Sequence, residues 1–155
     1  MARAYVGLGS NLGDRAATLS RAVELLGRAP GIDVIAISAF RETDPVGYVD
    51  QPPFLNGAVA IETELAPRDV LDVLLAVERD LGRTRLGPRY GPRTVDLDLL
   101  LVDGIVVDEP GLTVPHPRLR ERAFALEPLA ELDPDLVVPG QGRVADLLRS
   151  LESTP

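Results

Sequence analysis

Apolar residues follow two different periods along the first two thirds of the chain. A two-residue period or a short apolar run, typical of strands, occurs at residues 3–8, 33–41, 54–63 and 94–102. Apolar residues recur every three or four positions, as in amphipathic helices, at residues 14–28 and 66–82. Loops rich in proline and glycine are predicted at residues 44–53 and 83–93. The pattern therefore predicts the element order β-α-β-β-α-β.

This order is typical of an α+β protein with a ferredoxin-like core, in which helices pack on one face of a mainly antiparallel sheet. Asp103 and Gly104 are typical of a tight hairpin turn into residues 105–107. The tail is richer in proline and is expected to add short helices near residues 118–126 and 144–151. Because the last 45 residues hold too few apolar positions for a core of their own, we expect residues 1–155 to form a single domain.

Glycines are concentrated after the first predicted strand, at Gly7, Gly9 and Gly13. The spacing resembles the dinucleotide-binding pattern G-x-G-x-x-G, but Leu12 stands where that pattern needs its last glycine. We therefore expect a turn that requires positive φ to be the reason for these glycines.

The charged residues exclude several kinds of chemistry. All 16 basic residues are arginine, the chain has no cysteine, and its single histidine is His116. The absence of lysine excludes a phosphate-loop lysine and a Schiff base, and the absence of cysteine excludes disulfides and thiolate sites. A net charge of −8 argues against a general nucleic-acid binder. Half of the arginines nevertheless lie in residues 79–93 and 118–122, which indicates a local anion site or, alternatively, solvated surface charge.

No apolar run approaches the roughly 20 residues that a membrane helix needs. The chain also enters a strand-like pattern at once, without a leader typical of secreted proteins. A chain without cysteine is compatible with the reducing cytosol. We therefore expect a cytoplasmic protein that contacts neither membranes nor nucleic acid.

The strongest candidate site is Asp96-Leu97-Asp98 in the fourth predicted strand. Alternate strand residues face the same side, so Asp96 and Asp98 project together about 6.7 Å apart while Val95, Leu97 and Leu99 face the core. Two like charges this close favour a bridging cation, and magnesium prefers oxygen ligands. The alternative is the polar face of a half-exposed strand.

Two further residues carry candidate chemistry. Glu78 interrupts an apolar helical stripe formed by Leu71, Leu74 and Leu81, so its carboxylate needs a partner or a cavity. A glutamate at the helix edge, paired with an arginine, is the alternative. His116 lies between two prolines and precedes three arginines, which indicates a phosphate site, although a lone histidine is also compatible with a structural role.

Phe54 and Asn56 lie two residues apart in the third predicted strand and so face the same side. An aromatic ring beside an amide suits a flat heterocycle that stacks and forms hydrogen bonds. Core packing is the alternative for Phe54.

Residues 89–100, Arg-Tyr-Gly-Pro-Arg-Thr-Val-Asp-Leu-Asp-Leu-Leu, resemble the signature of the 6-hydroxymethyl-7,8-dihydropterin pyrophosphokinase family of folate synthesis. Segments 9–12, 43–47, 50–56 and 112–117 agree with this family in order and spacing, so the resemblance runs from about residue 3 to about residue 140. The chain departs from better-known members at Tyr90, Gly111 and Pro117.

The resemblance implies transfer of pyrophosphate from ATP to the hydroxymethyl group of the dihydropterin, with release of AMP. It implies that Asp96 and Asp98 hold two Mg²⁺ ions and that Arg83 and Arg93 are mobile catalytic arginines. The ATP-binding residues that it implies are Glu78, Arg83, Arg85, Arg93, Leu99, Thr113, His116 and Arg122. The pterin-binding residues that it implies are Thr43, Asp44, Val46, Phe54, Asn56 and Phe124.

Two other functions remain open at this point. A magnesium-dependent phosphohydrolase would use the same aspartates without the Phe54, Asn56 and Phe124 platform. A non-catalytic nucleotide- or pterin-binding module would not need both Asp96 and Asp98. In each case we expect a monomer whose partners are small molecules.

Overall fold

The computed structural model describes residues 1–43, 52–82 and 95–152. The core elements are β1 (Ala2–Ser10), α1 (Arg15–Arg28), β2 (Ile32–Ile37), β3 (Arg41–Thr43), β4 (Phe54–Thr63), α2 (Pro67–Asp80) and β5 (Asp96–Val102). They are followed by β6 (Val107–Glu109), β7 (Leu112–Val114), the 3-10 helix η1 (Leu119–Glu121), α3 (Ala123–Leu132), β8 (Val137–Val138), β9 (Gly142–Arg143) and α4 (Val144–Glu152). Most of the predicted loop at 44–53 and all of the one at 83–93 lie outside the described residues.

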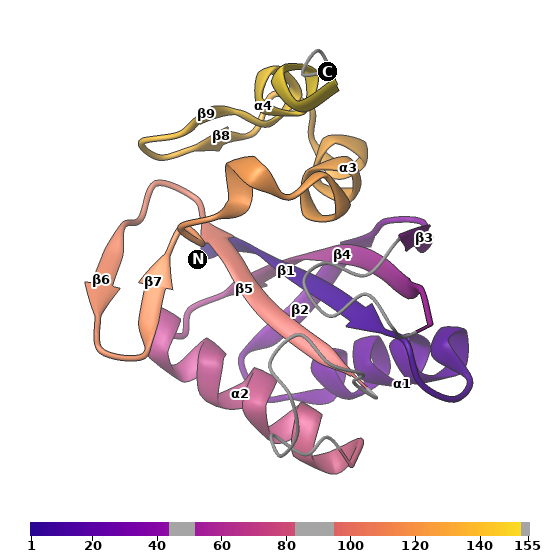
Figure 1. The fold of residues 1–155 in the computed structure, drawn as a ribbon. Coiled ribbons are helices and arrows are strands. Elements are labelled where there is room, and N and C mark those ends of the chain that lie inside the picture. The colour runs from indigo at the N-terminus through magenta and orange to yellow at the C-terminus, as the bar shows by residue number, and fades with distance from the viewer. Residues whose placement is uncertain (44–51, 83–94, 153–155) are drawn as a thin grey trace.

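The central sheet has the strand order β2-β4-β1-β5, and every neighbouring pair is antiparallel (Figure 1). This arrangement confirms the predicted ferredoxin-like core. The predicted strand at 33–41 is wrong in one respect, because it forms two strands, β2 and β3, that both pair with β4. Between them, Ser38 Oγ accepts the N–H of Ala58 at 2.9 Å, and the ring of Phe40 lies against Gly57. The apolar run continues through this break, so the sequence pattern does not reveal it.

Helices α1 and α2 cover one face of the sheet, below it in Figure 1. Their buried Leu19, Leu26 and Leu74 pack with Val59 and Ile61 of β4 to form the first core. These helices end where the pattern predicts, because each has one apolar stripe that must be buried.

The opposite face carries a second core, which corrects the expectation that helices pack on one face only. Leu119, Leu126 and Leu129, from η1 and α3, are fully buried against Tyr5 and Ala60 of the sheet. The central strands are therefore apolar on both faces, as is usual for strands covered on two sides. Together with α4, these elements form the layer above the sheet in Figure 1.

The predicted turn at Asp103 and Gly104 is confirmed by the hydrogen bond from the Ile105 N–H to the Val102 carbonyl at 3.0 Å. The predicted continuation as a strand through residues 105–107 is wrong, because only one bridge joins Val102 to Ile105. Strand β6 pairs with β7 instead, around a second turn that contains Gly111 at φ +77°.

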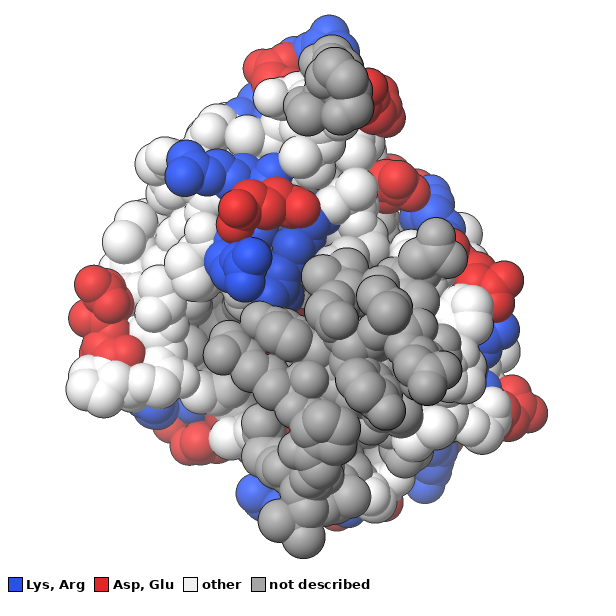
Figure 2. Space-filling view, in the orientation of Figure 1, with Lys and Arg blue, Asp and Glu red and all other residues white. Residues whose placement is uncertain are grey.

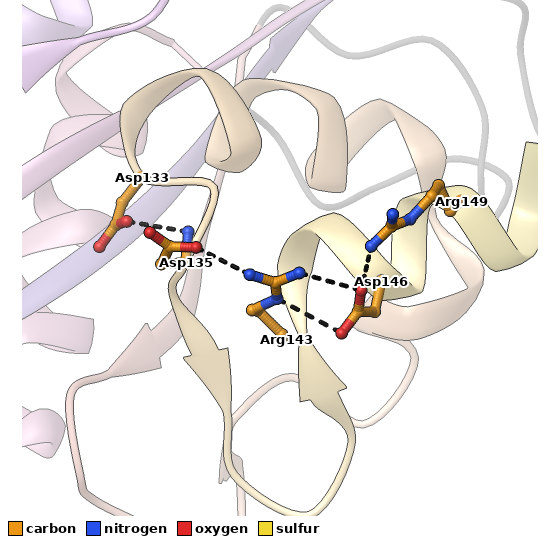
Figure 3. Close-up of polar contacts among 5 residues, drawn as sticks. All are labelled: Asp133, Asp135, Arg143, Asp146 and Arg149. Carbon is orange, nitrogen blue, oxygen red and sulfur yellow. Dashed lines mark hydrogen bonds and ion pairs between the residues drawn. The ribbon is translucent and has the colours of Figure 1, made fainter.

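An ion-pair network ties together the end of the chain (Figure 3). Arg143 donates to Asp135 Oδ1 at 2.8 Å and to both carboxylate oxygens of Asp146, which also pairs with Arg149. Exposed pairs of this kind contribute little each. The network therefore fixes how β9 meets α4 more than it stabilises the fold. Within the described ranges, no helix is long and apolar enough to cross a membrane.

Candidate active site

Three adjacent strands bring the predicted polar residues to the second face of the sheet. In the register of β1, Gly9 lies opposite Asn56 of β4 on one side and opposite Asp96 of β5 on the other. Gly7 lies opposite Asp98. Facing residues in neighbouring strands point to the same side of the sheet. The amide of Asn56, the glycine at position 9 and the carboxylate of Asp96 therefore lie side by side in one row across three strands.

The expectation that a positive-φ turn explains the three glycines is correct for Gly13, at φ +65°, and wrong for Gly7 and Gly9. The latter two lie inside β1, in extended conformation. A Cβ on Gly9 would lie 2.8 Å from Asn56 Oδ1. The missing side chains of these two glycines leave room for the Leu100 side chain over Gly7 and for the Asn56 amide over Gly9.

Asp96 and Asp98 are half-buried, while Val95, Leu97 and Leu99 between and beside them are buried in the first core. This confirms the predicted alternation of the segment. In the described part of the chain, no group of three or more His, Cys, Asp or Glu side chains could hold a metal. A two-carboxylate site fits Mg²⁺, which commonly takes one or two protein carboxylates and completes its shell with water and substrate phosphates.

Glu78 joins α2 to the strand that carries the aspartates. Its side chain is only 2% exposed, and Oε2 accepts the backbone N–H of Leu97 at 2.9 Å. This hydrogen bond satisfies a donor on the outer edge of β5, between Asp96 and Asp98. Glu78 is accommodated in the apolar stripe of α2 because its carboxylate accepts a hydrogen bond from the backbone of the neighbouring edge strand β5.

His116 is held by its backbone and by one ring nitrogen. Its N–H donates to the Leu100 carbonyl at 2.8 Å, and its Nδ1 accepts the Arg118 N–H at 3.2 Å. Burial, followed by the positive charge of Arg122, lowers the pKa of His116 from 6.5 to about 4, although Asp96 acts in the opposite direction. At neutral pH the ring is therefore uncharged and carries its proton on Nε2.

A cleft of about 300 Å³ opens at the outer edge of β5. Its walls come from α2, β5 and the segment around β7, namely Leu71, Leu97, Asp98, Leu99, Gly111, Leu112, Thr113, His116 and Pro117. The walls are mostly apolar, with a carboxylate, a hydroxyl and an imidazole among them. Such a lining suits a flat apolar group attached to a charged one.

The predicted pterin residues lie on the β4 side of Gly9. Asn56 is buried, and its Nδ2 donates to Thr43 Oγ1 of the neighbouring β3. Phe54 lies beside them, since a Cβ on Gly9 would be 3.8 Å from its Cδ1. Phe54 and Asn56 therefore face the same side, as predicted.

Phe124 belongs to α3, which covers the same face of the sheet, and it packs against the second core. The guanidinium carbon of Arg122 lies 5.7 Å from the centre of the Phe124 ring, within the range of a cation–π contact. Arg122 is one of three arginines, with Arg118 and Arg120, at η1. Figure 2 shows basic side chains gathered around an acidic one near the middle of the view.

Three residues that the sequence pattern does not single out support these walls. Asn11 is buried, and its Nδ2 donates to the Pro52 carbonyl at 3.0 Å. Arg15 and Arg68 bind backbone and carboxylate oxygens next to the pterin residues and the cleft, respectively. Arg15 and Arg68 lie in the first turn of a helix, where the helix dipole disfavours a positive charge. This unusual position is the sequence feature that could have singled them out. The predicted residues Arg83, Arg85, Arg93, Asp44 and Val46 lie outside the described residues.

Comparisons with known proteins give a consistent result. The sequence profile of the 7,8-dihydro-6-hydroxymethylpterin-pyrophosphokinase (HPPK) family matches residues 5–134. The chain is 54% identical, over 141 residues, to the 2-amino-4-hydroxy-6-hydroxymethyldihydropteridine pyrophosphokinase of Methylorubrum extorquens, covering 91% of this chain and 89% of that protein. It is 45% identical, over 146 residues, to the protein of the same name from Pseudomonas aeruginosa, covering 94% and 90%.

A solved structure of an HPPK-DHPS from Plasmodium falciparum superposes with a TM-score of 0.73 at 13% sequence identity. The match covers 96% of this chain and 45% of that one, so the chain spans less than half of the larger protein. At this level of identity the likeness shows that the fold is shared.

Proposed function

Because this chain belongs to the 7,8-dihydro-6-hydroxymethylpterin-pyrophosphokinase family, which transfers pyrophosphate from ATP to hydroxymethyldihydropterin in folate synthesis, we propose that the transfer takes place around Asp96 and Asp98. ATP enters from the β5 edge, and the pterin enters from the side of Asn56. The two substrates then meet near Gly9, which lies between Asn56 and Asp96 in the sheet.

The observation that carries this proposal is the cleft at the β5 edge, because it combines apolar surface with Asp98, one of the two aspartates. Leu71, Leu99 and Leu112 offer apolar surface to the adenine, and Thr113 offers a hydroxyl. Asp98 and His116 line the same cleft, and we place the triphosphate beside them. Glu78 contributes to the ATP site by fixing the Leu97 backbone at the wall of the cleft.

Asp96 and Asp98 are the proposed ligands of two Mg²⁺ ions. When bound there, the ions would offset the negative charge of the phosphates and lower the pKa of the substrate hydroxyl. The pair suits this role because both carboxylates are half-buried on one side of a rigid strand. A bound cation would relieve the repulsion between them.

His116 and Arg122 are the proposed phosphate contacts within the described residues. Since His116 Nδ1 already accepts a hydrogen bond, its Nε2–H is the donor that remains for a phosphate oxygen. Arg122 supplies a forked positive charge. Arg83, Arg85 and Arg93 are proposed to contact the phosphates on the strength of their sequence positions.

The pterin is proposed to stack on Phe54 and Phe124, with its polar edge toward Asn56 and Thr43. The Asn56 Oδ1 lies over Gly9 and is available as an acceptor, while its Nδ2 is directed at Thr43. Asp44 and Val46 follow Thr43 directly and are proposed to continue this contact.

In the transfer, the pterin hydroxyl oxygen forms a bond to the β-phosphorus of ATP as the bond from that phosphorus to the AMP oxygen breaks. AMP leaves, and the hydroxyl proton passes to solvent. Because a kinase of this type depends chiefly on positioning and electrostatics, the chain needs no dedicated general base. We also propose that residues 1–155 act as one domain, as a monomer, in the cytoplasm.

The test measures AMP release from ATP with and without hydroxymethyldihydropterin, at a series of Mg²⁺ concentrations, for the unmodified chain, Asp98→Ala and Asp108→Ala. We expect AMP only when both pterin and Mg²⁺ are present, with nearly all turnover lost in Asp98→Ala. Asp108 is an exposed aspartate of β6, so its replacement controls for the loss of one charge.

Folding is checked by circular dichroism, and both variants should remain folded. Retained turnover in Asp98→Ala would contradict the assignment of the metal site. Phosphate release without pterin would indicate a phosphohydrolase instead, and the absence of turnover would indicate a binding module.

A further inference from the structure

We propose that two arginines at the starts of the two core helices are positioning residues, one for each substrate. Arg15 in the first turn of α1 holds the pterin wall, and Arg68 in the first turn of α2 holds the nucleotide wall. This inference rests on the proposed placement of the pterin and ATP and adds the residues that set each wall.

Arg15 joins the ends of two strands. Its Nη1 donates to Glu42 Oε1 at 3.0 Å and to the Pro53 carbonyl at 2.9 Å. Glu42 directly precedes Thr43, and Pro53 directly precedes Phe54, and these two pterin residues face each other in the β3–β4 register. The guanidinium of Arg15 therefore sets the spacing between Thr43 and Phe54, the two residues proposed to contact the pterin.

Arg68 makes the corresponding contacts at the other substrate site. Its Nε and Nη2 donate to Glu109 Oε1 at 3.1 and 2.7 Å, and Nη2 donates to the Pro110 carbonyl at 2.8 Å. The next three residues, Gly111 to Thr113, line the cleft opposite Leu71, which lies one helical turn after Arg68. A Cβ on Gly111 would lie 3.6 Å from Arg68 Nη1, so the guanidinium lies directly behind this wall.

The positions of both arginines argue for a role beyond stability. The N-terminal end of a helix dipole favours anions, so a cation in the first turn is slightly destabilising there. Both arginines are also partly exposed, and exposed ion pairs contribute little to folding. What distinguishes them is a second bond, to a backbone carbonyl, next to a residue that faces a substrate.

The experiment compares steady-state kinetics of Arg15→Gln, Arg68→Gln and Arg21→Gln, with each substrate varied at saturating levels of the other. We expect Arg15→Gln to raise the KM for the pterin about three- to tenfold and to leave the KM for ATP within twofold. Arg68→Gln should do the reverse, and kcat should stay within twofold in both. These sizes correspond to losing one or two hydrogen bonds. Arg21 pairs with Glu24 on the exposed side of α1 and is the control.

The partners of the arginines give a second set of variants. Glu42→Gln should reproduce the shift in pterin KM, and Glu109→Gln should reproduce the shift in ATP KM, each more weakly because the carbonyl contact remains. Equal changes in both KM values, or changes that match a drop in the unfolding midpoint, would show that the arginines act only on stability and would overturn the proposal. Unchanged KM values in both arginine variants would overturn it as well.

Two further variants separate this inference from the proposed function. Phe124→Ala should raise the KM for the pterin, and Thr113→Val should raise the KM for ATP, if the substrates are placed correctly. If these two respond as stated while the arginine variants do not, only the positioning role is wrong. If they do not respond, the placement itself is wrong and the inference is overturned with it.

Discussion

The missing side chain of Gly9 is what allows β1 to take part in the proposed site. Its neighbours across the sheet are Asn56 and Asp96, and a Cβ at this position would be 2.8 Å from the Asn56 amide oxygen. Any other residue would force that amide to move. A central strand normally gains from a side chain in each row, so the glycine gives up packing to keep the site open.

His116 is the other residue whose surroundings decide its chemistry. Burial and Arg122 favour the neutral ring, whereas Asp96 favours the charged one, and the net effect is a pKa of about 4. A neutral imidazole donates from Nε2 without adding a positive charge to the phosphate site. The attraction for phosphate there would then come from arginine and metal ions.

This lowered pKa predicts a pH dependence of stability. Between pH 6.5 and about 4 the unfolded chain binds a proton at His116 that the folded chain does not. The free energy of unfolding should therefore fall as the pH is lowered through this window. Urea unfolding at pH 7.0, 6.0, 5.0 and 4.5 should show a smaller loss for His116→Gln than for the unmodified chain. The carboxylates contribute equally to both chains, so identical pH profiles would contradict the lowered pKa.

Among the elements, the contact between α2 and β5 has the most direct bearing on the site. Glu78 accepts an N–H of the edge strand between the two aspartates, and Leu71 of the same helix lines the cleft. Helix α2 thus serves both the first core and the site. The β6–β7 hairpin supplies the opposite side of the cleft.

The role of Glu78 can be tested by comparing a variant that removes its acceptor oxygen with one that keeps it. Glu78→Ala should lower the free energy of unfolding by about 1–3 kcal/mol, because it leaves the Leu97 N–H buried without that partner. It should also lower kcat, since β5 can then move relative to the metal site. Glu78→Gln keeps an acceptor oxygen and should retain most of the stability.

Asp72→Ala, at an exposed position of the same helix, is the control for removing a carboxylate from α2. Chemical denaturation and AMP release measure the two effects. Equal stability of Glu78→Ala and Asp72→Ala would contradict the proposed role of the hydrogen bond.

The helices of the core were predictable because a single apolar stripe with a clear period specifies them. Helix α1 was expected at residues 14–28 and occupies Arg15–Arg28. Helix α3 continues to Leu132, six residues beyond the predicted end near 126, although it contains Pro128. Proline normally ends a helix, but here Leu126 and Leu129 are buried in the second core and hold the helix together. Tertiary packing of this kind is not visible in the local pattern.

For the whole molecule, the site lies beside the second core, toward the Gly9 end of β1. Residues near Tyr5 are closed over by α3, while the Gly9 end of β1 carries the site. The sequence predicted that Asp96 and Asp98 share one side of the sheet, and that Phe54 and Asn56 do so too, because alternation in a strand fixes which side each residue faces. It did not predict the cleft or the roles of Arg15 and Arg68, because these depend on contacts between segments far apart in the chain.

The charge distribution also makes sense at this scale. The net charge of −8 would repel ATP if it were spread evenly over the surface. Three arginines instead lie at η1, and many of the carboxylates elsewhere are paired with arginines, such as Asp146 with Arg143 and Arg149. Arginine is therefore concentrated near the proposed phosphate site of an acidic protein.

Two cores on opposite faces of one sheet predict a single unfolding transition. Leu74 of α2 and Leu126 of α3 are both fully buried, one in each core. Replacing either by alanine should cost about 2–5 kcal/mol. Because β1 and β4 contribute to both cores, loss of one core also exposes the back of the other, and the two should melt together. In native-state hydrogen exchange, the most protected amides of α2 and α3 should lose protection by equal amounts in either variant. If Leu126→Ala lowers protection in α3 alone, the second layer unfolds independently and the coupling through the sheet is wrong.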